Sequence, residues 1–138
     1  MLTFWKEEYR IGVDEIDRQH KNMCDAMGRF QKALDDRAAG DVVEETFLLL
    51  KNTLAEHFRN EERYMSVINY PKTDLEEHVD GHLDVLFTFD HEYYRWKDTA
   101  AADRYEGRLL NLCTWAIGEL LASDLKVKTF LEMRKAGA

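Results

Sequence analysis

The sequence predicts an all-α protein, an up-down-up-down antiparallel four-helix bundle, because three observations agree. Helix breakers are rare, since the 138 residues include one proline and seven glycines. Apolar residues recur with a period close to that of an α-helix through four long segments, and nothing in the sequence supports β structure. The connections between the segments are short, so neighbouring helices are expected to be antiparallel and to cross at about 20°. We expect residues 1–138 to form a single domain, which this length suits.

The first two helices are predicted from their apolar stripes and from the residues that end them. After an N-terminal arm, the first stripe continues to the Gly40-Asp41 junction and comprises Ile16, His20, Met23, Met27, Phe30 and Leu34. Asp41 is expected to be the N-cap of the second helix, and Glu44, three residues later, would complete a capping box. The second stripe stops before Asn69-Tyr70-Pro71 and comprises Val43, Phe47, Leu50, Leu54, His57, Glu61, Tyr64 and Ile68.

The third and fourth helices are expected to open with the same capping-box pattern. Thr73 with Glu76 opens the third helix, whose stripe comprises Leu75, His78, His82, Val85, Phe89, Tyr93 and Trp96. Asp103 with Glu106 opens the fourth, whose inward residues are expected to be Leu109, Leu112, Trp115, Ala116, Glu119 and Leu120. A break near Ser123 would leave a short C-terminal helix that contains Val127, Phe130 and Leu131.

Charge and composition exclude several classes of protein. A formal net charge of −8 argues against binding to nucleic acid, which needs lysine and arginine gathered on one surface. No uncharged apolar run approaches the ~20 residues of a membrane span, and the first residues lack the basic and apolar regions of a signal peptide. We therefore expect a cytoplasmic protein without a membrane partner, and a monomer. Cys24 and Cys113 lie among apolar neighbours and are expected to be buried free thiols.

Polar side chains at core positions form the most informative pattern. His57 and Glu61 are four residues apart, as are His78 and His82, so each pair shares one helix face. In an antiparallel bundle, His20 near the start of the first helix lies at the level of both pairs. Burying these groups without partners would cost several kcal/mol, and a shared metal ion would compensate them. Imidazole and carboxylate suit iron, manganese or zinc, whereas the lack of a paired cysteine motif excludes thiolate zinc sites and iron–sulfur clusters.

The fourth helix offers two acidic residues at the same level. Glu119 lies on the expected apolar stripe and Asp124 at the expected helix break. Their five-residue offset is not a single-face spacing, so a kink or a helix end would be needed to aim both at the centre. The alternative makes Asp124 a helix cap and Glu119 a solvated residue at the rim. We favour Asp124 as a metal ligand and keep Glu119 as a candidate ligand.

From residue 4 to about residue 131 the chain resembles the hemerythrins, particularly the bacterial single-domain form. The stretch from Phe4-Trp5 to His20 is similar to the opening arm and first ligand of that family, and residues 57–62 are similar to its second-helix motif. Tyr70-Pro71, followed by residues 78–82, is similar to its third-helix motif, with a loop two residues longer. The resemblance covers nearly the whole chain, and these motifs together are highly specific.

The resemblance implies a non-haem di-iron centre, two iron ions joined by an oxo or hydroxo bridge. The resemblance implies that one iron is held by His20 and His57 and the other by His78 and His82. It implies that Glu61 and Asp124 bridge the two irons. Where the family has a histidine four residues after a tryptophan, this chain has Glu119 after Trp115. A carboxylate in place of a neutral imidazole lowers the charge of the cluster by one and favours the ferric state. We therefore expect a lower reduction potential and faster autoxidation than in a five-histidine site.

Three functions follow from these observations. The first is an oxygen-binding protein for storage, delivery, transport or sensing of O2, which would meet the iron held by His20 and His57. The second is a di-iron redox protein or sensor that reacts with O2, peroxide or NO, and Glu119 is its sequence support. The third is a structural metal-bound helical module. We expect a binding protein rather than a peroxidase or oxidase, with molecular oxygen as its ligand, no catalytic residue, and an electron-transfer protein as a further partner.

Overall fold

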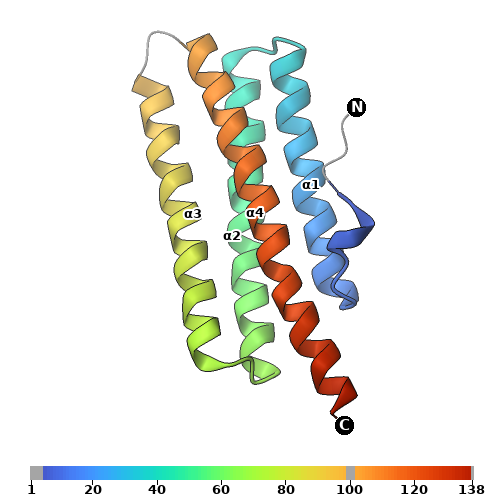
Figure 1. Cartoon of the computed structure of the whole chain (residues 1–138). Coiled ribbons are helices and arrows are strands. Elements are labelled where there is room, and N and C mark those ends of the chain that lie inside the picture. The colour runs from blue at the N-terminus through green and yellow to red at the C-terminus, as the bar shows by residue number, and fades with distance from the viewer. Residues whose placement is uncertain (1–4, 99–101, 138) are drawn as a thin grey trace.

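The structure, a computed structural model, consists of four long helices preceded by a short 3₁₀ turn (Figure 1). It describes residues 5–98 and 102–137, apart from the side chains of residues 102–105. The elements are η1 (Glu7–Tyr9), α1 (Asp14–Asp35), α2 (Gly40–Val67), α3 (Lys72–Asp98) and α4 (Ala102–Ala136). The described residues contain no strand, and the predicted all-α four-helix bundle is confirmed.

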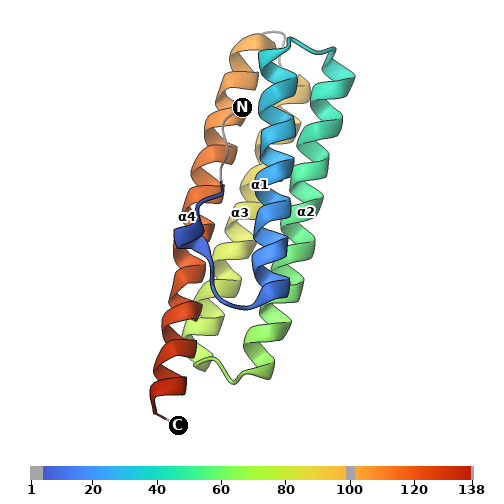
Figure 2. The ribbon, with the colours of Figure 1, turned by 90° about the vertical axis from the view of Figure 1, so that its right-hand side faces the viewer.

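Successive helices run in opposite directions, and each packs against two others. Helix α1 contacts α2 and α4, and α3 contacts the same two helices from the other side (Figures 1 and 2). The N-terminal arm passes over α1 and α4, and Trp5 and Tyr9 pack on the core (Figure 2). The buried Asp17 carboxylate accepts the backbone N–H groups of Ile11 at 2.7 Å and Gly12 at 3.0 Å. This contact fastens the arm to the first turn of α1.

Two apolar clusters fill the bundle and leave a polar layer between them. The larger one includes the rings of Phe30, Phe47 and Phe89, which follow one another with centroids 5.6 Å apart. The smaller one consists of Ile11, Ile16, Met65 and Val127. On α1, His20 lies between Ile16 of the smaller cluster and Met23 of the larger. The buried polar residues therefore occupy a layer about one helical turn thick, with apolar packing above and below it.

Two predicted helix starts are wrong by two residues each. Helix α2 begins at Gly40 with Ala39 as its N-cap, and the Asp41 carboxylate accepts only the N–H of the next residue, Val42, at 3.0 Å. The helix starts earlier because the Ala39 carbonyl already accepts two helical N–H groups. Helix α3 begins at Lys72, which places Thr73 inside the helix. The side chain of Asp103 lies outside the described residues.

The fourth helix is longer than predicted, and its buried face is turned. Helix α4 continues without a break through Ser123, so the predicted short C-terminal helix is the last part of α4. Trp115 is 57% exposed and Glu119 is also exposed, contrary to their predicted inward positions. The face that packs inward instead comprises Leu109, Cys113, Ala116, Ile117, Leu120, Leu121, Asp124 and Val127. The fourth helix therefore presents Asp124, and not Glu119, to the polar layer.

Both cysteines are buried free thiols, as expected. Burial in apolar surroundings, with a smaller contribution from Asp25, raises the pKa of the Cys24 thiol to about 12, and burial alone raises the pKa of Cys113. Neither thiol is therefore ionised near neutral pH. Among the described residues, no helix combines the length and apolar composition that a membrane span requires.

Candidate metal centre

All four helices contribute a side chain to one layer of the bundle interior. Each helix supplies its residue from a position that the apolar pattern assigns to the core, and the antiparallel order brings these positions to one height. The six residues that meet there are His20, His57, Glu61, His78, His82 and Asp124. They form two groups whose candidate ligand atoms all lie within 4.8 Å of one another inside each group.

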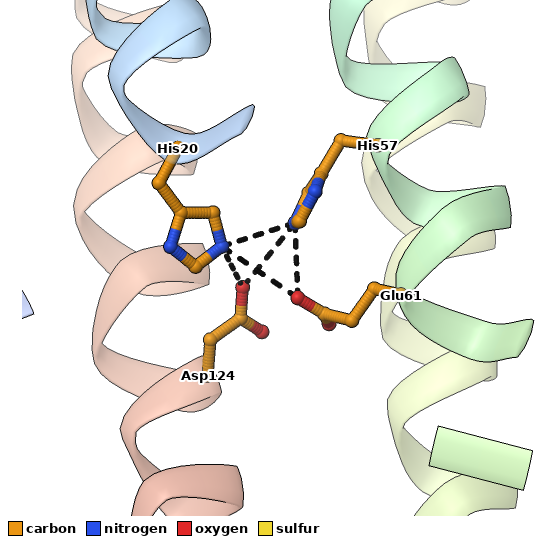
Figure 3. Close-up of side chains that lie close together, drawn as sticks. All are labelled: His20, His57, Glu61 and Asp124. Carbon is orange, nitrogen blue, oxygen red and sulfur yellow. Dashed lines mark hydrogen bonds and ion pairs between the residues drawn. The ribbon is translucent and has the colours of Figure 1, made fainter. Parts of the chain in front are cut away.

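The first group joins α1, α2 and α4 around His20 and His57. Their Nε2 atoms are 3.1 Å apart and point toward a common centre, where the carboxylates of Glu61 and Asp124 meet them (Figure 3). His20 Nε2 lies 2.8 Å from Asp124 Oδ2, and His57 Nε2 lies 2.9 Å from Glu61 Oε2. Metal bonds of about 2.1 Å place neighbouring ligand atoms roughly 3 Å apart, so these separations suit ligands of one ion.

The second group joins α2, α3 and α4 around His78 and His82. His78 Nε2 lies 3.0 Å from Asp124 Oδ1 and is in close contact with Glu61 Oε1. His82 Nε2 lies 3.5 Å from the same Glu61 oxygen. These separations again match those between ligands of one metal ion.

The two carboxylates belong to both groups and divide their oxygens between them. Glu61 presents Oε2 to His57 and Oε1 to His78 and His82. Asp124 presents Oδ2 to His20 and Oδ1 to His78. A carboxylate that offers one oxygen to each of two adjacent ligand sets can bridge two metal ions. The donor set is therefore two imidazoles and two carboxylate oxygens for each half of the centre.

Unsatisfied buried atoms show that the residues fit a bound cation. Besides His20 Nδ1, whose ring faces the centre with Nε2 instead, the buried atoms His82 Nε2, Glu61 Oε2 and Asp124 Oδ1 make no hydrogen bond of normal geometry within the described residues. A buried polar atom without a partner costs about 1–3 kcal/mol, and several in one layer would be strongly destabilising. These three atoms belong to residues of the two ligand groups, and each can offer a lone pair. Coordination of metal would therefore satisfy all three together.

The pKa shifts in the layer also show that the two buried carboxylates favour positive charge close to them. Burial opposes protonation of His20 and His78, but contacts with Asp124 and Glu61 outweigh it and raise the pKa of His20 to about 9 and that of His78 to about 10. The pKa of His57 is raised for the same reason. Burial opposes ionisation of Glu61, yet the four imidazoles hold its pKa well below its usual range. Without metal, protons on His20 and His78 offset negative charge in the layer, and a cation would replace those protons.

Two hydrogen bonds behind the ligands fix the orientation of the rings. His57 donates its Nδ1–H to Gln19 Oε1 at 2.7 Å, and His82 donates its Nδ1–H to Glu62 Oε1 at 2.9 Å. Because these oxygens accept the hydrogen bonds from Nδ1, each ring turns its Nε2 toward the centre. Sequence reasoning missed the roles of Gln19 and Glu62. Each directly precedes or follows a ligand on its helix, and that adjacency is the signal that could have identified them.

Glu119 is the one predicted ligand that the structure leaves outside both groups. Its side chain is exposed on α4, where it lines a cavity of about 280 Å³ together with His78 and His82. The other six predicted residues are brought together in the two groups. His78 is half-buried, whereas His20, His57 and His82 are at most 2% exposed.

Comparison with known proteins agrees with this arrangement. The model of the hemerythrin HHE cation binding domain matches residues 11–125. The bacteriohemerythrin of Clostridium acetobutylicum is 25% identical over 129 residues, which cover 89% of this chain and 96% of that protein. The bacteriohemerythrin of Stenotrophomonas maltophilia is 30% identical over 73 residues, which cover 51% of this chain and 45% of that protein. Since the domain match runs from the arm into α4 and includes every residue of both groups, the chain belongs to the hemerythrin family.

Proposed function

We propose that this protein is a non-haem di-iron protein that binds O2 reversibly. The residues proposed to hold one iron are His20 and His57, and those proposed to hold the other are His78 and His82. Glu61 and Asp124 are proposed to bridge the two irons. When bound, two ferrous ions at these positions would supply the electrons that let O2 bind and leave without cleavage of its bond.

The observation that carries the proposal is the division of the carboxylate oxygens between two equivalent ligand sets. A single metal ion would need only one set, whereas Glu61 and Asp124 each face both. Four of the six proposed ligand residues are histidines, and a ligand set richer in imidazole than in carboxylate supports reversible binding rather than oxygenase chemistry.

The surroundings of the centre support a role that requires exclusion of water. The ring of Phe58 stacks on His82 with centroids 3.9 Å apart, and its side chain is 2% exposed. Met23 and Leu54 are fully buried in the adjacent apolar cluster. Apolar packing of this kind keeps water and protons away from a buried metal and slows loss of electrons from it.

The proposal is tested by anaerobic loading with two equivalents of ferrous iron per chain. Visible spectra are then recorded before air is admitted, after it is admitted and after it is removed. We expect an oxygen-dependent absorption band that disappears on deoxygenation over several cycles. Irreversible conversion to a ferric spectrum in the first cycle would contradict reversible binding.

The second candidate function is a redox protein or sensor that reacts with O2, peroxide or NO. The observation in its favour is the position of Glu119 at the wall of a cavity that reaches His78 and His82. We propose that this carboxylate can also coordinate the iron on that side, which would stabilise the ferric state. Catalytic turnover of hydrogen peroxide by the iron-loaded protein, at a rate that falls in Glu119→Gln, would favour this function over oxygen binding.

A further inference from the structure

The two halves of the centre have equal ligand sets but unequal access to solvent. Each half consists of two imidazoles and the same two carboxylates. On one side, His20 and His57 are 0% and 2% exposed. A small cavity that reaches His57 is also lined by Gln19, which accepts the hydrogen bond from His57 Nδ1. On the other side, the cavity of about 280 Å³ between α3 and α4 is lined by both histidines of that half.

One residue that lines this cavity, His82, has a buried nitrogen without a hydrogen-bond partner among the described residues. His82 is 2% exposed, its ring lines the cavity, and its Nε2 makes no hydrogen bond within the described residues. A metal held by this nitrogen would receive four protein ligands, which leaves coordination positions unfilled on an ion that prefers six, as iron commonly does. Because His78 and His82 both line the cavity, we expect the unfilled positions of a metal held by them to face it.

The charge of the cavity selects the class of external ligand. Glu77, Asp84 and Glu119 line it, and none of its described lining residues is a lysine or an arginine. Three carboxylates that line the cavity repel small anions and leave the approach of neutral molecules unaffected. The remaining walls include Trp115, Val85 and Leu120, which suit a small molecule of low polarity.

Glu119 lies where it can compete with such a ligand. It lines the cavity from α4, opposite the two histidines on α3, and it is exposed rather than held in the core. Within the described residues its carboxylate makes no hydrogen bond or ion pair, so a change of rotamer into the cavity would break no such contact. The carboxylate and an external ligand would then seek the same coordination position.

We propose that a small neutral ligand, of the class of diatomic gases, reaches and binds the metal held by His78 and His82 through this cavity, and that Glu119 competes for the position. This inference rests on the proposed di-iron function. It assigns the external ligand to the opposite half of the centre from the half that the family resemblance implies. It also gives the residue that departs from the family pattern a role in controlling access.

Gly81 provides a test that leaves the metal ligands unchanged. It lines the cavity, and a Cβ at this position would meet nothing within 4 Å, so Gly81→Leu places a side chain in open space at the wall. Gly118→Leu is the matched control, because Gly118 is also an exposed helical glycine with nothing within 4 Å and does not line the cavity. Replacing glycine in a helix raises helix propensity, so both variants are expected to fold.

The measurement is the association rate of nitric oxide with the anaerobic ferrous protein, followed by stopped-flow absorption. Iron content and circular dichroism are recorded for each sample. We expect Gly81→Leu to slow association by at least about tenfold at unchanged iron content, and Gly118→Leu to match the wild type. Equal rates in all three proteins would overturn the inference while leaving the proposed function intact. Absence of bound iron in the wild type would overturn both.

The role of Glu119 is tested with a second matched pair. Glu119→Gln removes the competing carboxylate and is expected to raise the nitric oxide association rate several-fold. Glu77→Gln removes a charge from the same cavity on α3 and is expected to leave the rate of this neutral probe unchanged. Equal acceleration in both variants, or no acceleration in Glu119→Gln, would overturn the competition of Glu119 for the metal.

Discussion

Glu61 is predicted to be the side chain on which both metal positions depend. It is fully buried, and its two oxygens face different histidine pairs. Glu61→Gln keeps the volume of the side chain but removes its negative charge and one of its two oxygen ligands. We expect this variant to lose both metal ions, whereas loss of a residue that serves one half should weaken only one.

Glu62→Gln is the matched control, because it makes the same chemical change one residue along α2. Glu62 accepts the hydrogen bond from His82 Nδ1, and loss of such a hydrogen bond behind one ligand lowers metal affinity about 10–100-fold. A metal ion present at about 100 times its dissociation constant stabilises the folded state by about 2.7 kcal/mol. For 138 residues this corresponds to a rise in Tm of about 9 °C per metal ion. The wild type should therefore gain about 18 °C on loading both ions.

The assay is differential scanning calorimetry of each protein with and without ferrous iron under anaerobic conditions, together with the iron content after gel filtration. Glu61→Gln should lose nearly all of the metal-dependent rise in Tm, and Glu62→Gln should retain at least about half of it. Comparing each variant with its own metal-free form removes effects of the substitution on the fold itself. If Glu61→Gln retained two irons and the full rise in Tm, the argument for bridging carboxylates would be refuted.

The remaining predictions concern protons, ring orientation and the N-terminal arm. The pKa values of about 9 for His20 and about 10 for His78 mean that both are protonated at pH 7 without metal, so loading should release protons, measurable by calorimetry in buffers of different ionisation enthalpy. Because these values lie above the usual 6.5, the stability they give the metal-free fold is complete below pH 6.5. It should fall as pH rises through 9 to 10, and denaturation midpoints that rise instead would contradict this. Gln19→Leu should weaken one metal position by about 10–100-fold at unchanged total capacity in a chelator competition, and loss of both ions would oppose a role confined to His57. Asp17→Ala should destabilise the fold by about 3 kcal/mol in urea unfolding, because it leaves two backbone N–H groups of the arm without an acceptor. An unchanged midpoint would show that the arm is held by its apolar contacts alone.

The fold was predictable because the apolar period is regular on three of the helices. On α1, the stripe from Ile16 to Phe30 is buried as expected. On α4, the apolar residues occupy more than one face, so the predicted inward set included both Trp115 and its neighbour Ala116. The structure buries Ala116 and exposes Trp115, because a small residue lets α4 approach the other helices closely. That choice depends on tertiary packing, which periodicity does not contain.

The candidate site was predictable to the extent that it interrupts the apolar stripes. His57, His82 and Glu61 stand at core positions, and burial of ionisable groups at one level indicates a shared partner. The position of Glu119 was not predictable, because it depends on the rotation of α4 about its axis, which is set by packing against the other helices. The ring-orienting residue Glu62 was missed because it lies one position away from the stripe, at the rim. Coordination of metal by the six clustered residues stays a prediction.

The central claim is that the bundle holds two metal ions that share Glu61 and Asp124. Anomalous diffraction at the iron edge from crystals loaded anaerobically with ferrous iron tests it most directly. The account predicts two separate peaks, one beside His20 and His57 and one beside His78 and His82, with a carboxylate oxygen of each shared residue next to each peak. A single peak at the middle of the layer, or a peak in only one group at saturating iron, would contradict the account.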